Sequence, residues 1–263
     1  MSICDLTQII DLDRYPLGDL IGFGAKCKRI FDEKGSLLLP GFVNANAIEA
    51  LKTEALAHKH LAYYCQQSHT AYLLAPDNTF DDTHPRNRQV ISSKGCITDD
   101  QIPLDSLLRV IYDHSVFRNF LGYVLNESTL YEYADPLSSV NVHYYEEGQE
   151  LGWHFDNSSF AVTLMIQSSE AGGEFEYIPK LRDASRGDMN FEGVGQALDG
   201  LTAPKKLKIN AGTLALFRGR NSLHRVTPVI GESSRIQTVL AYNTEPNIAL
   251  SEQARMTFYG RIE

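Results

Sequence analysis

The sequence predicts a mainly β fold with helical support, a double-stranded β-helix of the cupin-like jelly-roll type. From about residue 138 onward, short segments rich in β-branched and aromatic residues alternate with glycine or polar turns. Before residue 125, apolar residues recur at helical spacing instead. The number of expected strands is enough to form a jelly roll, and we expect the N-terminal helices to brace one of its faces.

Two helical regions are expected in the first half of the chain. In the first, Asn44 or Asn46 can cap a helix in which Ile48, Leu51 and Ala55 share one face. In the second, apolar positions at helical spacing are Leu104, Leu107, Leu108, Ile111, Val116, Phe117 and Phe120. The expected strands of the second half are, in order, SVNVHYYE, FAVTLMIQ, EFEYI, KLKI, TLALF, HRVTPV and RIQTVLAY.

A polar stretch with four glycines, residues 180–203, interrupts these strands. Long insertions of this kind are often lids, and we expect one here. No linker or internal repeat divides the chain, so it is interpreted as a single domain, 1–263. Within it we expect a mainly helical supporting region (1–125), a jelly-roll core (126–247) and a C-terminal tail (248–263).

Composition limits the classes of function. The chain has 263 residues with 43% hydrophobic content and a formal net charge of −9. This charge argues against a nucleic-acid ligand, because such binders present a basic face. The four widely spaced cysteines are typical of free thiols in a reducing compartment. Neither a signal peptide nor a long apolar run is visible, so we expect a cytoplasmic protein without a membrane partner. The sequence leaves the oligomeric state open.

The most informative motif is His154-x-Asp156, which His224 follows at a distance. Residues i and i+2 of a strand point the same way, so His154 and Asp156 can reach one metal ion while Phe155 faces the other side. Two imidazoles and one carboxylate can bind one face of an octahedral Fe(II), which leaves positions for a chelating co-substrate and for dioxygen. A jelly roll can bring His224 to the same ion. Without a metal, His154 and Asp156 would be an ordinary surface pair.

Two further residues suit the co-substrate. Arg235 lies on the strand expected after His224, and its guanidinium can pair in bidentate fashion with the distal carboxylate of 2-oxoglutarate. The hydroxyl of Tyr145, in the segment Tyr145-x-x-Gly148, can donate to the same carboxylate. Alternatively, Arg235 forms a surface ion pair with Glu232, and Tyr145 is a core aromatic residue.

Five features follow one another along the chain: Tyr145-x-x-Gly148, His154-x-Asp156, the Gly172-Gly173-Glu174-Phe175 turn, His224 and Arg235. This is the order found in Fe(II)/2-oxoglutarate-dependent dioxygenases, which the chain resembles over about residues 138–245. The early LDRYPL stretch and the segment ADPLSSVNVHYYEEGQELGWHFDNSSF resemble the radical halogenases of free amino acids such as lysine, and their hydroxylase relatives. The halogenases carry a small residue where Asp156 stands, which leaves room for chloride. The resemblance therefore implies a hydroxylase with Fe(II) and 2-oxoglutarate as cofactors.

The expected substrate is a small molecule, such as a free amino acid, for which several polar residues are candidates. Arg86 and Arg88 can bind a carboxylate. Asp135, Glu132 or Asn157 can bind an ammonium group, and Trp153 can form a pocket wall or fill the core. His143 is either a core residue or a supporting residue of the site, and the histidines of the first half are interpreted as structural. Three alternatives remain: a peptide hydroxylase with an open groove, a radical halogenase, and a non-catalytic jelly-roll binding module.

Overall fold

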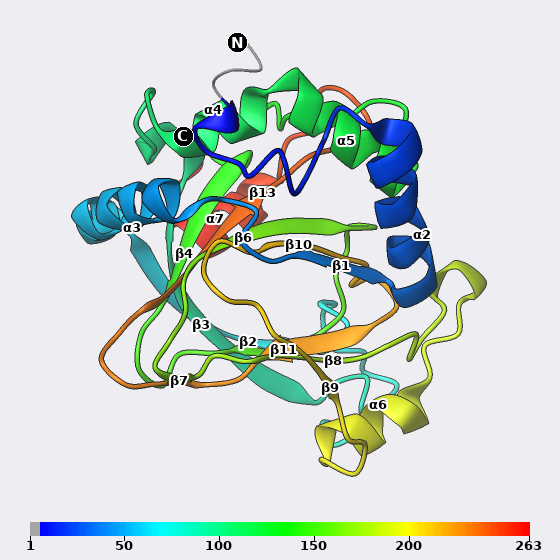
Figure 1. Ribbon diagram of the computed structural model, residues 1–263. Coiled ribbons are helices and arrows are strands. Elements are labelled where there is room, and N and C mark those ends of the chain that lie inside the picture. The colour runs from blue at the N-terminus through cyan, green and yellow to red at the C-terminus, as the bar shows by residue number, and fades with distance from the viewer. Residues whose placement is uncertain (1–5) are drawn as a thin grey trace.

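The computed structural model describes residues 6–263, and Cys4 lies outside them. Most strands form one antiparallel sheet in the order β1-β10-β6-β13-β4-β3-β5-β11-β8-β9, with β2 beside β3, and β7 pairs separately with β12. The sheet curls on itself, so that β1, β10 and β6 lie in one layer and β2, β11 and β8 in the other (Figure 1). The strands are β1 (Ser36–Leu39), β2 (Tyr63–Thr70), β3 (Gln89–Ile97), β4 (Val140–Tyr145), β5 (Leu151–His154), β6 (Ala161–Gln167), β7 (Ala171–Gly172), β8 (Phe175–Ile178), β9 (Lys205–Leu207), β10 (Leu214–Phe217), β11 (Leu223–Val226), β12 (Val229–Ile230) and β13 (Arg235–Leu240).

Helices cover the outside of the first layer (Figure 1). Asn44 caps α3, as predicted, because its side chain accepts a hydrogen bond from the backbone N–H of Ala47. The helical elements are η1 (Leu20–Gly24), α2 (Ala25–Lys34), α3 (Ala45–His58), η2 (Lys59–Leu61), η3 (Asp99–Gln101), α4 (Leu107–Asp113), α5 (Ser115–Leu125), η4 (Ala184–Arg186), α6 (Phe191–Leu198) and α7 (Glu252–Tyr259). Among residues 6–263, none of the helices is long and apolar enough to cross a membrane.

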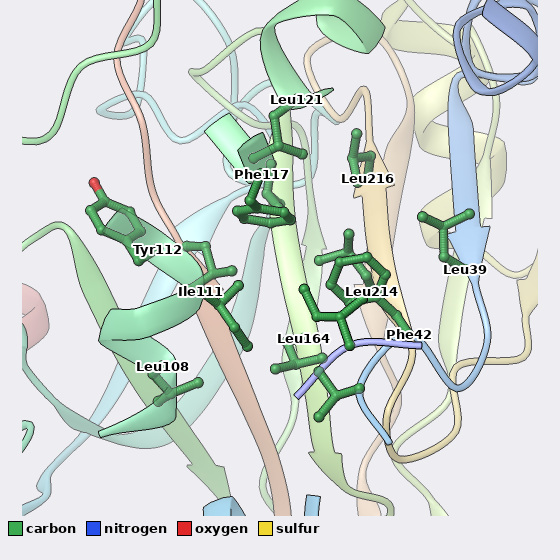
Figure 2. Close-up of a cluster of buried hydrophobic side chains, with 14 of the residues drawn as sticks. Leu39, Phe42, Leu108, Ile111, Tyr112, Phe117, Leu121, Leu164, Leu214 and Leu216 are labelled. Atoms are coloured by element: carbon green, nitrogen blue, oxygen red, sulfur yellow. The ribbon is translucent and has the colours of Figure 1, made fainter. Parts of the chain in front are cut away.

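The main hydrophobic core lies between these helices and the sheet. Figure 2 shows Phe117 and Leu121 of α5 next to Leu164 of β6 and Leu216 of β10, all buried. Side chains alternate along each strand, so Leu214 and Leu216 of β10 face the helices, whereas Ala215 and Phe217 line a cavity inside the curled sheet. The helices thus stabilise one face of the sheet and leave its other face free to form a site.

Two long strands, β2 and β3, add to the helices expected in the first half of the chain. They pair along their whole length, from Tyr63 opposite Cys96 to Thr70 opposite Gln89, and β3 also pairs with β4 and β5. Many of their residues are polar, so the apolar pattern that normally marks a strand is weak here. These strands extend the sheet beside the site.

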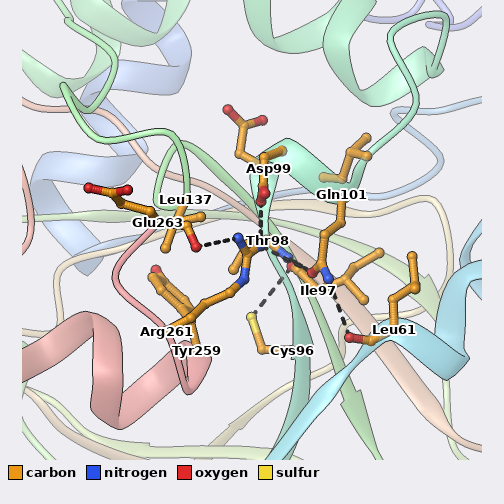
Figure 3. A network of polar contacts seen from close by, with 12 residues as sticks. Leu61, Cys96, Ile97, Thr98, Asp99, Gln101, Leu137, Tyr259, Arg261 and Glu263 are labelled. Carbon is orange, nitrogen blue, oxygen red and sulfur yellow. Dashed lines mark hydrogen bonds and ion pairs between the residues drawn. The ribbon is translucent and has the colours of Figure 1, made fainter.

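The C-terminal segment is also part of the fold, because it contains helix α7. Arg261 follows this helix, and its guanidinium donates to Thr98 Oγ1 and Asp100 Oδ1, each at 2.6 Å. Figure 3 shows Arg261 beside Thr98, at the end of β3. These contacts hold α7 against β2 and β3 and bring Phe258 to the cavity wall.

Candidate metal centre

Three possible metal ligands meet inside the curled sheet. His154 ends β5, Asp156 follows it, and His224 of β11 lies directly opposite His154 in the antiparallel register. Nε2 of His154 is 3.5 Å from Oδ1 of Asp156, and Nε2 of His224 is 3.4 Å from the same oxygen. Ligand atoms of the three residues all lie within 4.8 Å of one another. The structure therefore brings together the three residues that the sequence predicts as metal ligands.

Backbone carbonyls fix the orientation of both imidazoles. Nδ1 of His154 lies 2.8 Å from the carbonyl oxygen of Gly152, and Nδ1 of His224 lies 3.0 Å from that of Ser222. A carbonyl can only accept, so Nδ1 carries the proton in each neutral ring. Nε2 then presents its lone pair toward the triad, which is the arrangement that metal-binding histidines use.

Asp156 has one oxygen without a partner. Its Oδ2 is buried and has no hydrogen bond within residues 6–263. The backbone of Gly219 packs against this carboxylate so closely that a Cβ at position 219 would lie 1.9 Å from Oδ2. A buried, unpaired carboxylate oxygen is costly, and a bound cation would satisfy it. The donor set thus fits a divalent metal ion.

The pKa shifts of the three residues also fit a site for a divalent metal ion. Burial raises the pKa of Asp156, but the imidazoles of His224 and His154 outweigh burial and hold this pKa well below the ordinary value of a carboxyl. Burial lowers the pKa of His154. Burial also opposes protonation of His224, but the negative charge of Asp156 outweighs it and raises the pKa of His224. The carboxylate is therefore ionised, and two nitrogens and one anionic oxygen are available to a metal such as Fe(II).

Arg235 of β13 is buried, with 1% of its surface exposed. It lies opposite Tyr145 in the register of β13 and β4, and its Cζ is 5.2 Å from the centre of the Tyr145 ring. Nε donates to the carbonyl of Gly173 at 3.1 Å and Nη2 to Oε1 of Gln237 at 2.5 Å, but the buried Nη1 has no partner in the described chain. No ion pair with Glu232 forms. A buried guanidinium with an unpaired N–H group is suited to an anionic ligand.

A cavity of about 360 Å³ opens beside the triad. Its wall contains all three possible metal ligands together with Tyr145 and Gln237. Arg235 lines an adjoining hollow near Gly173, which shares Phe175, Leu207 and Ile209 with the cavity. This volume is near the lower end for ligand pockets, so it suits a co-substrate with a small substrate.

Several residues predicted to bind the substrate do not line this cavity. Trp153 points to the opposite face of β5, where Arg225 covers its ring at 4.7 Å, and therefore serves packing. Asn157 is exposed to solvent although it follows Asp156 directly. Both lie outside the cavity wall because the alternation of the strand and the turn after it direct their side chains away.

The four charged candidates lie elsewhere too. Arg88 forms an ion pair with Asp199 at 2.5 Å, and Arg86 lies in the loop before β3, outside the cavity wall. The carboxylate of Asp135 accepts hydrogen bonds from the backbone of Leu137 and Leu250 and from the hydroxyl of Ser138. Glu132 is exposed. None of these four residues lines the cavity: Arg88 and Asp135 have partners from distant segments, Glu132 is exposed, and Arg86 lies in a loop with its Nη1 buried and without a hydrogen-bond partner in the described chain.

The predicted lid does not cover the cavity either. No residue of 180–203 belongs to its wall. The segment packs on the outer face of the second layer, where Val194 and Ala197 of α6 join a buried cluster with Phe155. Arg182 lies over the Phe155 ring, 4.1 Å from its centre. The segment thus supports the outer face of the strand that carries His154.

The sequence analysis did not assign three cavity residues to the site: His69 of β2, Lys94 of β3 and Phe258 of α7. His143 of β4, for which it left a supporting role open, also lines the cavity. The ring of His69 lies edge-on to His154, with 6.2 Å between centroids, and its Nε2 is 2.6 Å from Oγ of Ser92. The alternation of Cys65, Gln67 and His69 toward the cavity was the signal that could have revealed this wall.

Comparisons with known proteins agree with this geometry. A sequence model of the family described as halogenase D matches residues 24–257. An oxidoreductase of the 2OG-Fe(II) oxygenase family from Burkholderia pseudomallei is 16% identical, with 87% of this chain and 94% of that chain covered and a TM-score of 0.54. The carbocyclase SnoK of nogalamycin biosynthesis, described as non-heme and alpha-ketoglutarate dependent, is 10% identical, with 90% and 92% covered and a TM-score of 0.57.

A third similar structure is HygX from Streptomyces hygroscopicus, solved with nickel, 2-oxoglutarate and hygromycin B. It is 14% identical, with 86% of this chain and 89% of that chain covered and a TM-score of 0.53. A search of curated proteins finds no match. The matches confirm the predicted jelly-roll fold and the predicted superfamily.

Proposed function

The chain belongs to the halogenase D family, and because it carries a carboxylate in the candidate metal centre, we propose that it is an Fe(II)/2-oxoglutarate-dependent hydroxylase. Its substrate would be a small polar molecule, such as a free amino acid, with an unactivated C–H bond. One molecule each of substrate, 2-oxoglutarate and dioxygen would give an alcohol, succinate and carbon dioxide.

In this proposal His154, Asp156 and His224 hold Fe(II), while Arg235 and Tyr145 hold the distal carboxylate of 2-oxoglutarate. When bound, iron and 2-oxoglutarate supply the oxidising chemistry that activates dioxygen. The protein fixes the ligands through the carbonyls of Gly152 and Ser222. The unpaired Nη1 of Arg235 and the unpaired Oδ2 of Asp156 support these roles, because each is a buried group without its expected partner in the described chain.

Asp156 is the observation that favours hydroxylation over halogenation. A halogenase needs a free position beside the iron for a halide, and a coordinated carboxylate fills that position. The close approach of Gly219 further limits the space around the carboxylate. A carboxylate that held Fe(II) here would leave no such position for a halide, so the expected product is an alcohol.

Two experiments test this proposal. The first replaces His154 or His224 by Ala, with the half-buried His58 of α3 replaced by Ala as a control. Succinate release that depends on Fe(II) should be lost in the two site variants and kept in the control. Full succinate release by either site variant under limiting iron would contradict the ligand assignment.

The second experiment is mass spectrometry of the product formed in saturating chloride. We expect a gain of one oxygen atom by the wild type. A chlorinated main product would instead support halogenation, the activity for which the family is described. Replacing Asp156 by Gly should weaken iron binding, because two neutral imidazoles bind Fe(II) less well than two imidazoles with an anion.

A further inference from the structure

The cavity beside the candidate metal centre contains a lysine that no acid neutralises. Lys94 of β3 lines the cavity, and its Nζ lies 3.4 Å from Nδ1 of His143. Among residues 6–263, no carboxylate lies within 4.0 Å of this ammonium, and Asp156 is the one acid in the cavity wall. Lysine is seldom placed in a partly buried site without an anionic partner. Lys94 is therefore a candidate for binding an anionic ligand.

Apolar side chains form part of the cavity wall that Lys94 lines. Leu73, Leu151, Phe217, Val239 and Phe258 belong to the cavity wall. A neighbouring hollow of about 240 Å³, next to α7, shares Lys94, His143 and Phe258 with the cavity and has no acidic residue in its wall. A ligand with an ammonium group would find no carboxylate here except the proposed iron ligand. The site is thus suited to an apolar body with one anionic end.

Lys94 and Arg235 face different parts of the interior. Tyr145 of β4 lies between them. It is opposite Arg235 in the register of β4 and β13. In the register of β3 and β4, Gly95 is opposite Tyr144, which places Tyr145 beside Lys94. Arg235 turns toward Gly173 and the hollow beside β9, whereas Lys94 borders the hollow beside α7. This separation assigns Arg235 to the co-substrate and leaves Lys94 for the substrate.

The charges of the site also support Arg235 as the partner of 2-oxoglutarate and Lys94 as the partner of the substrate. This count rests on the proposed function. Fe(II), Asp156, doubly ionised 2-oxoglutarate and Arg235 sum to zero. Lys94 then contributes one uncompensated positive charge. A substrate with one negative charge neutralises it, whereas a basic amino acid such as lysine would add a second positive charge to a site of low dielectric constant.

We propose that Lys94 binds the carboxylate of the substrate, and that the substrate is a carboxylic acid with an apolar body and no side-chain ammonium group. Within the proposed hydroxylase function, this replaces a polar amino acid as the expected substrate by an acid of this class, and it excludes lysine. Lys94 acts here as a specificity-determining residue.

The test measures the binding of matched probes to the anaerobic complex of enzyme, Fe(II) and 2-oxoglutarate by calorimetry. The probes are straight-chain carboxylates of four to ten carbons, represented by hexanoate, together with hexanamide, 6-aminohexanoate and lysine. Hexanamide lacks the anion, and 6-aminohexanoate adds a distal ammonium group. The variants are Lys94→Met, which keeps most of the unbranched chain without the charge, and Lys94→Arg, which keeps the charge. The affinity for 2-oxoglutarate is measured in parallel for each variant.

We expect the carboxylate to bind about 10- to 100-fold more tightly than hexanamide, which is the usual contribution of a charge-assisted hydrogen bond. Lys94→Met should lose this difference, Lys94→Arg should keep most of it, and the affinity for 2-oxoglutarate should stay unchanged in both. Any of three results would overturn the inference: lysine binds most tightly of the probes, hexanoate and hexanamide bind equally well, or Lys94→Met binds 2-oxoglutarate more weakly than the wild type does. Binding of 2-oxoglutarate without binding of any carboxylate refutes this inference alone. A wild type that does not bind 2-oxoglutarate refutes the proposed function and this inference with it.

Discussion

Gly219→Ala is expected to remove the metal from the site without unfolding the protein. A Cβ at position 219 would lie 1.9 Å from Oδ2 of Asp156 and 2.7 Å from Cε1 of His224, where an ordinary contact is 3.4 Å or more. The carboxylate must therefore move by about 1.5 Å, three times the tolerance of about 0.5 Å within which a functional site must be held. An aspartate side chain can make this movement, so the cost falls on metal binding rather than on the backbone.

We expect Gly219→Ala to lower the affinity for Fe(II) by about 100-fold, the upper end of the range for residues that orient metal ligands. This corresponds to about 2.8 kcal/mol of binding free energy. The assay is anaerobic competition for Fe(II) between the protein and a chelator, with urea unfolding of the metal-free protein measured beside it. Gly18→Ala is the matched control, because a Cβ at position 18 would meet no atom within 4 Å. A variant that keeps wild-type affinity for Fe(II) would refute the described packing of Gly219 against Asp156.

Three further outcomes follow from the structure. Arg235→Lys keeps the charge but loses the guanidinium fork, so the Michaelis constant for 2-oxoglutarate in succinate release should rise about 10- to 100-fold, while Arg186→Lys on the surface should leave it unchanged. Leu164→Ala should lower the free energy of unfolding in urea by about 2–5 kcal/mol, because Leu164 is buried between β6 and the helices. Burial raises the pKa of Cys27 to about 11 and that of Cys96 to about 12, so the thiolate fraction of each at pH 8 is small. In a Cys4→Ser variant, both should react with a thiol reagent far more slowly than free cysteine, and the rate should rise with pH up to these values; rapid modification at pH 8 would contradict their burial.

Two of the three candidate metal ligands could be placed side by side from the sequence, because their geometry is local. His154 and Asp156 are two residues apart at the end of a strand, and alternation alone directs both to one side. The inward direction of Arg235 could also be predicted from alternation, because it lies on a strand whose apolar pattern is clear. The tight packing of Gly219 could not be predicted, because it depends on how the loop before β11 meets the loop after β5, two segments far apart in the chain.

The part of the cavity that we propose for the substrate was not predicted for a similar reason. Lys94 lies on a strand whose polar residues hide its pattern, and Phe258 lies on a helix in a region expected to be only a tail. Charged residues of the loops, such as Arg88 and Asp135, looked equally suitable in the sequence. Their partners in the structure, Asp199 for Arg88 and the backbone of Leu250 for Asp135, come from distant segments, and one sequence does not show these pairings.

Alternation along β6 and β10 also explains how the protein combines a stable core with a polar site. On β6, Leu164 belongs to the core beneath the helices, while Thr163 beside it lines the cavity. The same holds for Leu216 and Phe217 on β10. The apolar contacts that stabilise the sheet therefore lie on one of its faces, and the buried charges of the site lie on the other. Because the helices stabilise the strands from outside, the interior can keep unpaired groups such as Nη1 of Arg235 ready for a ligand, at a cost that the core offsets.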